Sequence, residues 1–297
     1  MQLNFLIATR RLCLIGVCML PSVGVATTAA AQSPPDPTQV ASPDSKVKRS
    51  NAAEEDDGVL NLAEPDVVVV NLPSGMRLPR LKSNFRLTHR FAGNLRRGGF
   101  GQQLGNLFGL DQGAVIGFEY RMAVAPHVQA AFYRSSFGKT IQLHGAFDAL
   151  RQRESMPVAM SALVSIEGTD NFRDEYSPSI GLVVSRRIGT RVAAYVTPIW
   201  ADNTAAALDT RRSTMFVGVG GRLRLGGTTY VAAEIAPRTA GYAPDEPSYG
   251  ISIEKRAGGH MFSLTFTNSF GTTFAQVARG GAANTLFLGF NLGRKFY

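Results

Sequence analysis

Hydrophobic residues alternate with small or polar residues along most of the chain after Arg80. In the stretch HMFSLTFT, at 260–267, Phe, Leu and Phe alternate with Ser, Thr and Thr. Strict alternation places successive side chains on opposite faces of a β-strand. About twelve runs of this kind, each about ten residues long, predict strands. They lie near 82–92, 112–122, 127–136, 139–151, 157–168, 178–188, 191–200, 214–225, 228–236, 248–256, 260–269 and 284–297.

The connections between these runs alternate in length. The short ones read MAVAPH, IGT, LGGT and RAGGH, and SSFGK is short where the pattern requires a long loop. Long external loops and short periplasmic turns are typical of outer-membrane β-barrels. The long ones span 93–111, 169–177, 201–213, 237–247 and 270–283.

The number of runs indicates which face of the sheet is apolar. Eight strands enclose an interior that side chains just fill, and wider barrels leave space. About twelve strands with an apolar interior would enclose a dry void, so we expect the apolar face to meet lipid and the polar face to line the lumen. The sequence thus predicts an all-β fold, a transmembrane antiparallel up-and-down β-barrel of about twelve strands. The alternative is a soluble β-sandwich, which would need polar outer faces.

The first residues have the pattern of a secretory signal peptide, predicted at 1–31. Arg10 and Arg11 precede an apolar core, and an A-x-A pattern follows at 29–31. An uncleaved anchor is the alternative, but the apolar core is short for a spanning helix. Export followed by barrel insertion predicts the bacterial outer membrane, with a periplasmic N-terminus.

Residues 32–65 are rich in Pro, Ser and charge and predict a disordered periplasmic segment. The run DVVVVNLPSG, at 66–75, is apolar and opens the predicted barrel domain, 66–297. It fits either a short strand or a segment docked in the barrel mouth. It also resembles the energy-coupling box of large TonB-dependent receptors, although the chain lacks their plug domain and larger barrel.

The chain ends FLGFNLGRKFY, an alternating run that we expect to close the barrel against the first strand. Phe296 and Tyr297 are candidates for the membrane-interface aromatic girdle. A final strand that ends on an aromatic residue resembles the signal read by the barrel assembly machinery. That machinery and outer-membrane lipid are therefore the expected partners.

Three short motifs carry a family resemblance. FRLTHRF, then LFGLDQG, then the ending GRKF resemble an uncharacterised, domain-of-unknown-function family of bacterial outer-membrane β-barrel proteins. The resemblance covers roughly 66–297 and implies a barrel in the outer membrane. It implies no reaction.

Composition narrows the chemistry. The formal net charge is +9, but Lys and Arg are scattered and no nucleic-acid motif accompanies them, so nucleic acid is not an expected partner. Both cysteines, Cys13 and Cys18, lie in the predicted signal peptide. Neither an HExxH motif nor a Cys–His cluster is present, so no metal or cofactor is expected.

The polar faces of the runs carry charged residues, and arginines slightly outnumber carboxylates. A narrow channel with mild anion preference and cross-strand pairs that stiffen the wall are both compatible with this pattern. The candidate lumen-lining residues are Arg86, Arg90, Glu119, Arg121, His144, Asp148, Glu167, Arg222, Arg224, Glu234, Glu254 and Arg256.

Two of these, His144 and Asp148, could orient a base for a nucleophile. Residues four apart on a strand lie about 13 Å from each other, too far for a hydrogen bond. We therefore expect lumen-lining residues and no enzyme. The loop 92–112, with Arg96 and Arg97, is a candidate constriction loop that folds into the lumen.

Three functions follow from this sequence. The first is a passive channel for small polar or anionic solutes. The second is a closed structural or interaction barrel without transport. The third is an outer-membrane lipid-modifying hydrolase.

Overall fold

A computed structural model describes residues 62–205 and 210–297 of the chain. The predicted signal peptide and residues 32–61 of the predicted periplasmic segment lie outside the described residues. In the part that is described, no helix is long and apolar enough to cross a membrane.

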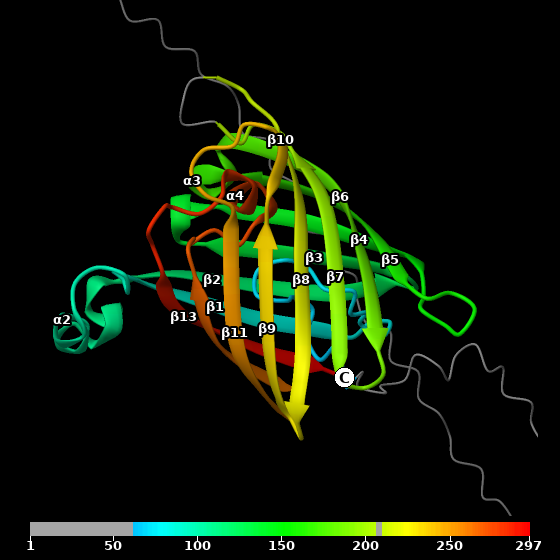
Figure 1. Ribbon diagram of the computed structural model, residues 1–297. Coiled ribbons are helices and arrows are strands. Elements are labelled where there is room, and N and C mark those ends of the chain that lie inside the picture. The colour runs from blue at the N-terminus through cyan, green and yellow to red at the C-terminus, as the bar shows by residue number, and fades with distance from the viewer. Residues whose placement is uncertain (1–61, 206–209) are drawn as a thin grey trace, which may run out of the picture. The chain divides into compact units, whose positions relative to one another are not determined.

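Antiparallel strands form one sheet that closes on itself (Figure 1). The closure joins the first strand to the last: Ser83 lies opposite Phe296, and Arg90 lies opposite Gly289. The strands are β1 (Ser83–Asn94), β2 (Ala114–Ala125), β3 (Val128–Ser135), β4 (Ile141–Leu150), β5 (Ala159–Gly168), β6 (Asp174–Ile188), β7 (Val192–Ala201), β8 (Thr214–Gly226), β9 (Thr229–Ala236), β10 (Arg238–Gly241), β11 (Ser248–Ala257), β12 (His260–Thr267) and β13 (Phe287–Phe296).

Strands β9 and β10 form one wall strand that is interrupted at Pro237. Both pair with β8, and the Val217 amide donates to the Pro237 carbonyl at 3.0 Å between them. The proline has no N–H to donate, so the ladder breaks there. The wall is therefore a closed antiparallel barrel of twelve strands, as the sequence predicted.

The two ends of the barrel differ. At the turn end, β8 joins β9 through Gly227, and β11 joins β12 through Gly258. Both glycines have positive φ, at 51° and 58°, which a tight turn requires and glycine adopts easily. At the loop end lie the helices α2 (Phe100–Gly105), α3 (Thr169–Phe172) and α4 (Phe274–Arg279) and the 3₁₀ turns η1 (Leu107–Gln112) and η2 (Phe137–Lys139).

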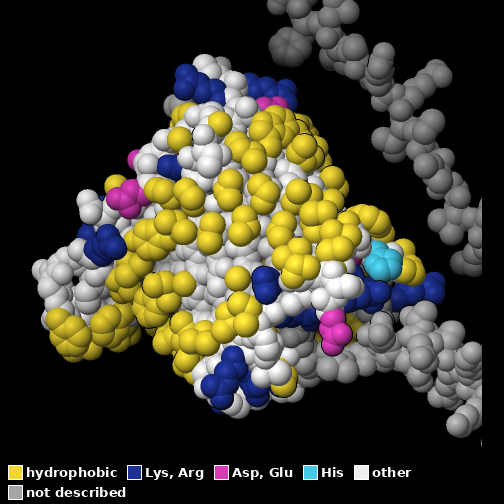
Figure 2. All heavy atoms as spheres, turned by 45° about the vertical axis from the view of Figure 1, so that its right-hand side comes forward, with side chains coloured by type: hydrophobic (Ala, Val, Ile, Leu, Met, Phe, Trp, Pro, Cys, Tyr) yellow, Lys and Arg dark blue, Asp and Glu magenta, His cyan; other side chains and the backbone are white. Residues whose placement is uncertain are grey.

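The barrel is apolar outside and polar inside. Along β2 the outward side chains Phe118 and Tyr120 are 42% and 47% exposed, whereas Glu119 and Arg121 between them are buried. Figure 2 shows hydrophobic side chains across the outer face, with Lys and Arg gathered mainly towards its ends. This face is suited to hydrocarbon and excludes the soluble sandwich.

Local differences from the prediction lie at the loop end. β6 begins at Asp174, before the predicted 178, because its first residues extend beyond the apolar band and carry no alternation. The short SSFGK connection is spanned by η2, a single turn. The long loop near 237–247 contains β10, which is too short to give a periodic signal.

Candidate functional site

The inner wall carries charged side chains that pair with one another. Glu119 on β2 lies between two arginines, with Arg86 Nη2 at 3.2 Å and Arg121 Nε at 3.1 Å from its carboxylate oxygens. All three side chains are buried. Buried charges are costly unless they are paired, and this triad meets that condition.

A second pair lies on the opposite side of the wall. Arg222 on β8 donates through Nε to Glu254 Oε2 at 2.7 Å and through Nη2 to Oε1 at 3.1 Å. Ser252 Oγ also donates to Glu254, at 3.0 Å. Arg222 and Glu254 are 2% and 1% exposed, so both are almost completely shielded from solvent.

What covers these charges is the chain's own N-terminal segment, named here the plug, residues 63–78. Residues 63–74 are all buried inside the barrel. The plug folds back on itself as a short hairpin, with the Val69 amide donating to the Leu72 carbonyl at 2.8 Å and the Ser74 amide to the Val67 carbonyl at 3.0 Å. The DVVVVNLPSG run is thus a docked segment and not a wall strand.

Glu234 on β9 holds the tip of this hairpin. Its carboxylate accepts three backbone N–H bonds: from Val70 at 2.9 Å, from Asn71 at 2.8 Å and from Leu72 at 3.0 Å. Hydrogen bonds to a charged acceptor are stronger than bonds between neutral groups. This contact joins residues more than 160 positions apart in the sequence.

Cationic and amide side chains hold the carbonyl side of the plug. Arg222 Nη2 donates to the Val68 carbonyl at 2.7 Å and to the Val69 carbonyl at 3.1 Å. Asn291 Nδ2 donates to the Val70 carbonyl at 3.1 Å, and Lys295 Nζ donates to the Pro65 carbonyl.

The start of the plug holds a buried acid. Glu64 accepts from the Gly75 amide at 2.8 Å and thereby ties the two ends of the hairpin together. Burial raises the pKa of the Glu64 carboxyl, and Arg187 and Arg222 partly offset that rise. The docked plug therefore favours the protonated form of this acid.

A second segment fills the lumen from the loop end. It is named here the cap, residues 268–286, and it contains α4, of which five residues are buried: Phe274, Ala275, Gln276, Val277 and Ala278. Figure 1 shows α4 within the barrel near the loop end. Gln276 Nε2 donates to Thr140 Oγ1 at 3.0 Å, and the Ala275 amide donates to Glu167 at 3.3 Å.

Plug and cap share one apolar cluster. Leu72 at the plug tip, Phe274 and Val277 of the cap, and Ile199 and Phe216 of the wall belong to it, all buried. Hydrophobic constrictions close pores because water leaves them. The lumen is therefore closed at this level.

A family comparison is consistent with this architecture. The family described as "Membrane bound beta barrel domain (DUF5777)" matches residues 66–296. The chain belongs to this family. The resemblance seen in the three sequence motifs is confirmed, and the barrel is a membrane-bound one.

Other comparisons add little. A NanC porin structure is 6% identical, with a TM-score of 0.46, over 72% of this chain and 99% of that chain. A triple mutant of the Rhodopseudomonas blastica porin is 14% identical, with a TM-score of 0.33, over 61% of this chain and 55% of that chain. No curated protein sequence matches this family member.

The prediction that the loop 92–112 folds into the lumen as a constriction was wrong. Arg96 and Arg97 are exposed, and α2 in the same loop has no buried residue. Figure 1 shows α2 projecting away from the wall. Arg96 Nη2 donates to the Tyr249 hydroxyl at 3.0 Å at the loop end. The lumen is filled instead by the plug and by the cap, in which α4 has five buried residues.

The other candidates face inward. Ten of the twelve lumen-lining candidates are buried, and Arg224 and Arg256 near the turn end are half-buried. Asp148 accepts from Ser161 Oγ at 2.8 Å and lies 3.7 Å from Arg77 of the plug, whereas the His144 ring lies 5.7 Å from Phe274. Their partners are thus parts of the plugged lumen. Among the described residues, no group of His, Cys, Asp and Glu could hold a metal ion.

Some functional residues were missed. Asn291 and Lys295 fall on the polar face of the final run, so alternation could have nominated them. Gln276 of the cap lies in a loop without periodicity, so no local signal pointed to it. Phe296 and Tyr297 are 44% and 48% exposed at the turn end, where the predicted aromatic girdle would lie.

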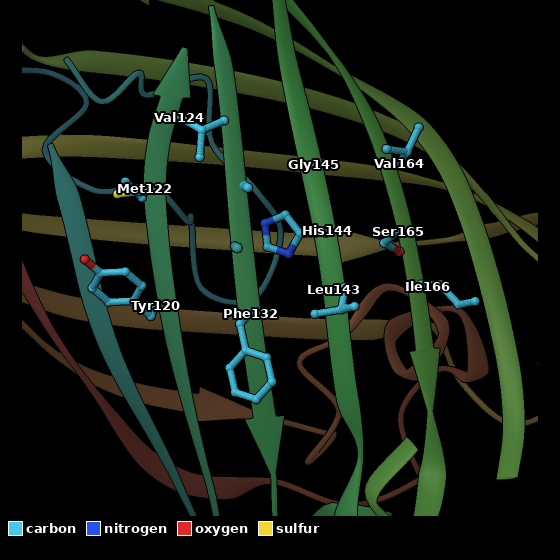
Figure 3. Close-up of a pocket in the computed structure, with 12 residues that line it drawn as sticks. Tyr120, Met122, Val124, Phe132, Leu143, His144, Gly145, Val164, Ser165 and Ile166 are labelled. Atoms are coloured by element: carbon cyan, nitrogen blue, oxygen red, sulfur yellow. The ribbon is translucent and has the colours of Figure 1, made fainter. Parts of the chain in front are cut away.

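The outer face carries an apolar groove of about 720 Å³ (Figure 3). Outward side chains of Tyr120, Phe132 and Leu143 border it. Ala130 and Gly145, paired across β3 and β4, are small and leave the space between them open. In a membrane-bound barrel this groove faces lipid.

Proposed function

We propose that this protein is a gated channel of the bacterial outer membrane, which the plug and the cap hold closed. The open passive channel that the sequence suggested does not fit a lumen filled from both ends. Displacement of the plug towards the turn end and of the cap towards the loop end opens a path for small polar solutes.

The buried charge of the wall carries this proposal. Replacing a buried ion pair by well-packed apolar residues is often neutral or stabilising, so a permanently filled lumen has no need of one. Here Arg86, Glu119, Arg222 and Glu254 are paired within the wall itself and stay paired when the plug leaves. Such a wall is suited to contact with water.

The topology supports an outer-membrane orientation. Both ends of the wall, Ser83 and Phe296, lie at the turn end. In outer-membrane barrels the short turns and both termini are periplasmic. The chain before the plug then lies in the periplasm, as the predicted signal peptide and periplasmic segment require.

The charge of the lumen supports only a weak anion preference. Buried wall cations and anions balance, five against five: Arg86, Arg90, Arg121, Arg222 and Lys295 against Glu119, Asp148, Glu167, Glu234 and Glu254. The half-buried Arg187, Arg224 and Arg256 add positive charge near the turn end. Anions are therefore favoured at this mouth, since rings of charge set selectivity.

Conductance in planar lipid bilayers tests the proposal. Three variants are compared with the full chain: one without residues 63–78, one with 271–280 replaced by an equally long Gly–Ser linker, and one with both changes. A variant without residues 98–106 of the exposed loop is the matched control. Heat-modifiable gel mobility checks that each variant is folded.

We expect the doubly changed variant to conduct steadily, the single variants to conduct less, and the control to stay closed. A folded double variant that remains closed would contradict a channel. In that case the second candidate function, a closed structural barrel, would be favoured, because the lumen is filled from both ends. Its test is loss of a co-purifying periplasmic protein when residues 32–61 are removed.

A further inference from the structure

The wall recognises the plug mainly through the plug's backbone. Glu234 accepts from the amides of residues 70–72, Arg222 donates to the carbonyls of residues 68 and 69, and Asn291 donates to the carbonyl of residue 70. Lys295 is a third donor, at the Pro65 carbonyl. These groups come from β8, β9 and β13. They would make the same contacts with another peptide of the same conformation, whatever its side chains.

Acceptor and donors lie on different sides of the bound backbone. The carboxylate of Glu234 meets N–H groups, whereas Arg222 and Asn291 meet C=O groups. An inorganic anion would need donors alone and would be repelled by Glu234. A chain of amides offers both kinds of group in the order that this wall requires.

Glycines of the wall make room for the plug's side chains. A Cβ on Gly218 would lie 2.6 Å from Leu72 Cδ1, a Cβ on Gly250 3.0 Å from Val70 Cγ1, and a Cβ on Gly220 3.2 Å from Val69 Cγ1. All three contacts are closer than ordinary van der Waals distance. The absence of a side chain at these three wall positions thus makes room for the branched aliphatic side chains of the plug.

Asn71 is the residue of the hairpin tip whose side chain the wall binds through a hydrogen bond. Its Oδ1 accepts from Arg90 Nη2 at 2.9 Å, and Arg90 Nη1 donates to Asn291 Oδ1 at 2.9 Å. The wall therefore links recognition of this amide to recognition of the backbone beside it through Asn291.

We infer that the lumen wall at Glu234, Arg222 and Asn291 is a peptide-binding site, that the plug occupies it in cis, and that the solutes admitted on opening are short peptides with branched aliphatic side chains. The inference rests on the proposed channel function. It adds the substrate class and gives the plug the role of an internal competitor of the solute.

Binding of a plug peptide to the barrel without residues 63–78 tests the site. The probe is a fluorescent peptide with the sequence of residues 65–74, PDVVVVNLPS, and anisotropy gives its Kd. The matched control is the same peptide N-methylated at the positions of Val70 and Leu72, which removes two donors to Glu234. We expect the control to bind about tenfold more weakly or worse, because bonds to a charged acceptor are lost.

The substitution Glu234→Gln in the barrel should reduce the difference between the two peptides. Equal binding of both peptides to the unsubstituted barrel would overturn the site. A second measurement uses the full chain, in case the barrel without residues 63–78 does not fold. Excess PDVVVVNLPS should speed thiol labelling of a Val68→Cys reporter by displacing the plug, and the N-methylated peptide should not.

Flux separates this inference from the proposed function. In the doubly opened variant, a valine tetrapeptide should cross lipid vesicles faster than a sugar of similar mass, and PDVVVVNLPS should block conductance. A variant that conducts but neither binds nor is blocked by the peptide overturns the inference alone. A variant that binds the peptide but does not conduct overturns the channel and leaves the site.

Discussion

The plug and the cap fill the same lumen with different chemistry. Both segments bury apolar side chains, but the plug is also held by charged wall groups: Glu234 on its amides and Arg222 on its carbonyls. The cap is held mainly by neutral contacts, such as the hydrogen bond between Gln276 and Thr140, and by burial of α4. Charged contacts can be replaced by water when the segment leaves, whereas apolar burial is lost outright.

The two segments also differ in attachment. The cap is joined to the wall on both sides, by β12 and β13. Its first residue, Asn268, is fixed by two hydrogen bonds: its side chain accepts from the Tyr249 amide at 2.8 Å and donates to the Pro247 carbonyl at 2.9 Å. Within the described residues, the plug is joined to the wall on one side alone, by residues 79–82 before β1. In the channel proposed above, this difference makes the plug the expected mobile gate and the cap the more fixed partner.

Thiol labelling can measure the two segments separately. The natural cysteines, Cys13 and Cys18, lie in the predicted signal peptide, so one introduced cysteine reports on one site. Val68→Cys reports on the plug and Ala278→Cys on the cap, since both positions are buried. Exposure of either reporter requires its segment to move.

The largest effect is expected for Arg222→Met. It leaves Glu254 unpaired in the wall, and breaking a buried pair costs about 3–5 kcal/mol. Denaturant unfolding in detergent should show this loss, and the Val68→Cys reporter should label faster. Arg224→Met, on a half-buried arginine of the same strand face, is the control and should change little.

The double variant Arg222→Met/Glu254→Met sharpens the same test. It should recover most of the stability, because neither charge is left alone, yet the plug reporter should still label fast. Slow labelling in the double variant would mean that Arg222 does not hold the plug.

Phe274→Ala should destabilise the cap and so test whether the cap can move without the plug. Truncation of a buried phenylalanine costs about 3 kcal/mol. Labelling of Ala278→Cys should increase strongly, and labelling of Val68→Cys only through the shared cluster with Leu72. If both reporters respond equally, plug and cap move as one unit and the distinction drawn between them is wrong.

Glu234→Gln should have a smaller effect, confined to the plug. The carboxylate accepts three amides, and the neutral amide that replaces it binds them less strongly, by about 2 kcal/mol. Faster labelling of Val68→Cys is the expected result. Glu167→Gln, whose carboxylate accepts from the cap amide of Ala275, is the matched control and should affect the cap reporter instead.

The smallest effect is the pH dependence from Glu64. Burial raises the pKa of the Glu64 carboxyl in the docked plug. The protonated carboxyl therefore stabilises docking fully when the pH is below the ordinary pKa of a glutamate, and this stabilisation is lost as the pH rises through the raised pKa. The Val68→Cys reporter should therefore be better protected in acid, as measured with a reagent whose reactivity does not depend on pH. Glu64→Gln should flatten this dependence and protect the plug at neutral pH. A steeper dependence in that variant would contradict the assignment.

The wall could be predicted from the sequence almost completely. Strand number, the inward and outward faces and the closing strand all follow from alternation, which is a local property of period two. The inward position of Arg86, Glu119 or Arg222 follows once the number of strands shows that the apolar face must meet lipid. The soluble alternative fails because the apolar side chains lie on the outer face, where a soluble sandwich would need polar ones.

The filling of the lumen was decided by the tertiary structure. The run VVVV reads locally as a strand, and its true partner Glu234 lies far along the chain. The loops 92–112 and 270–283 are both rich in glycine, and only their fit to the closed wall places the second inside. Alternation determines the two faces of a strand because the pattern lies within the sequence of that strand. Which segment enters a barrel depends on donors, acceptors and clefts that exist only once twelve strands have closed.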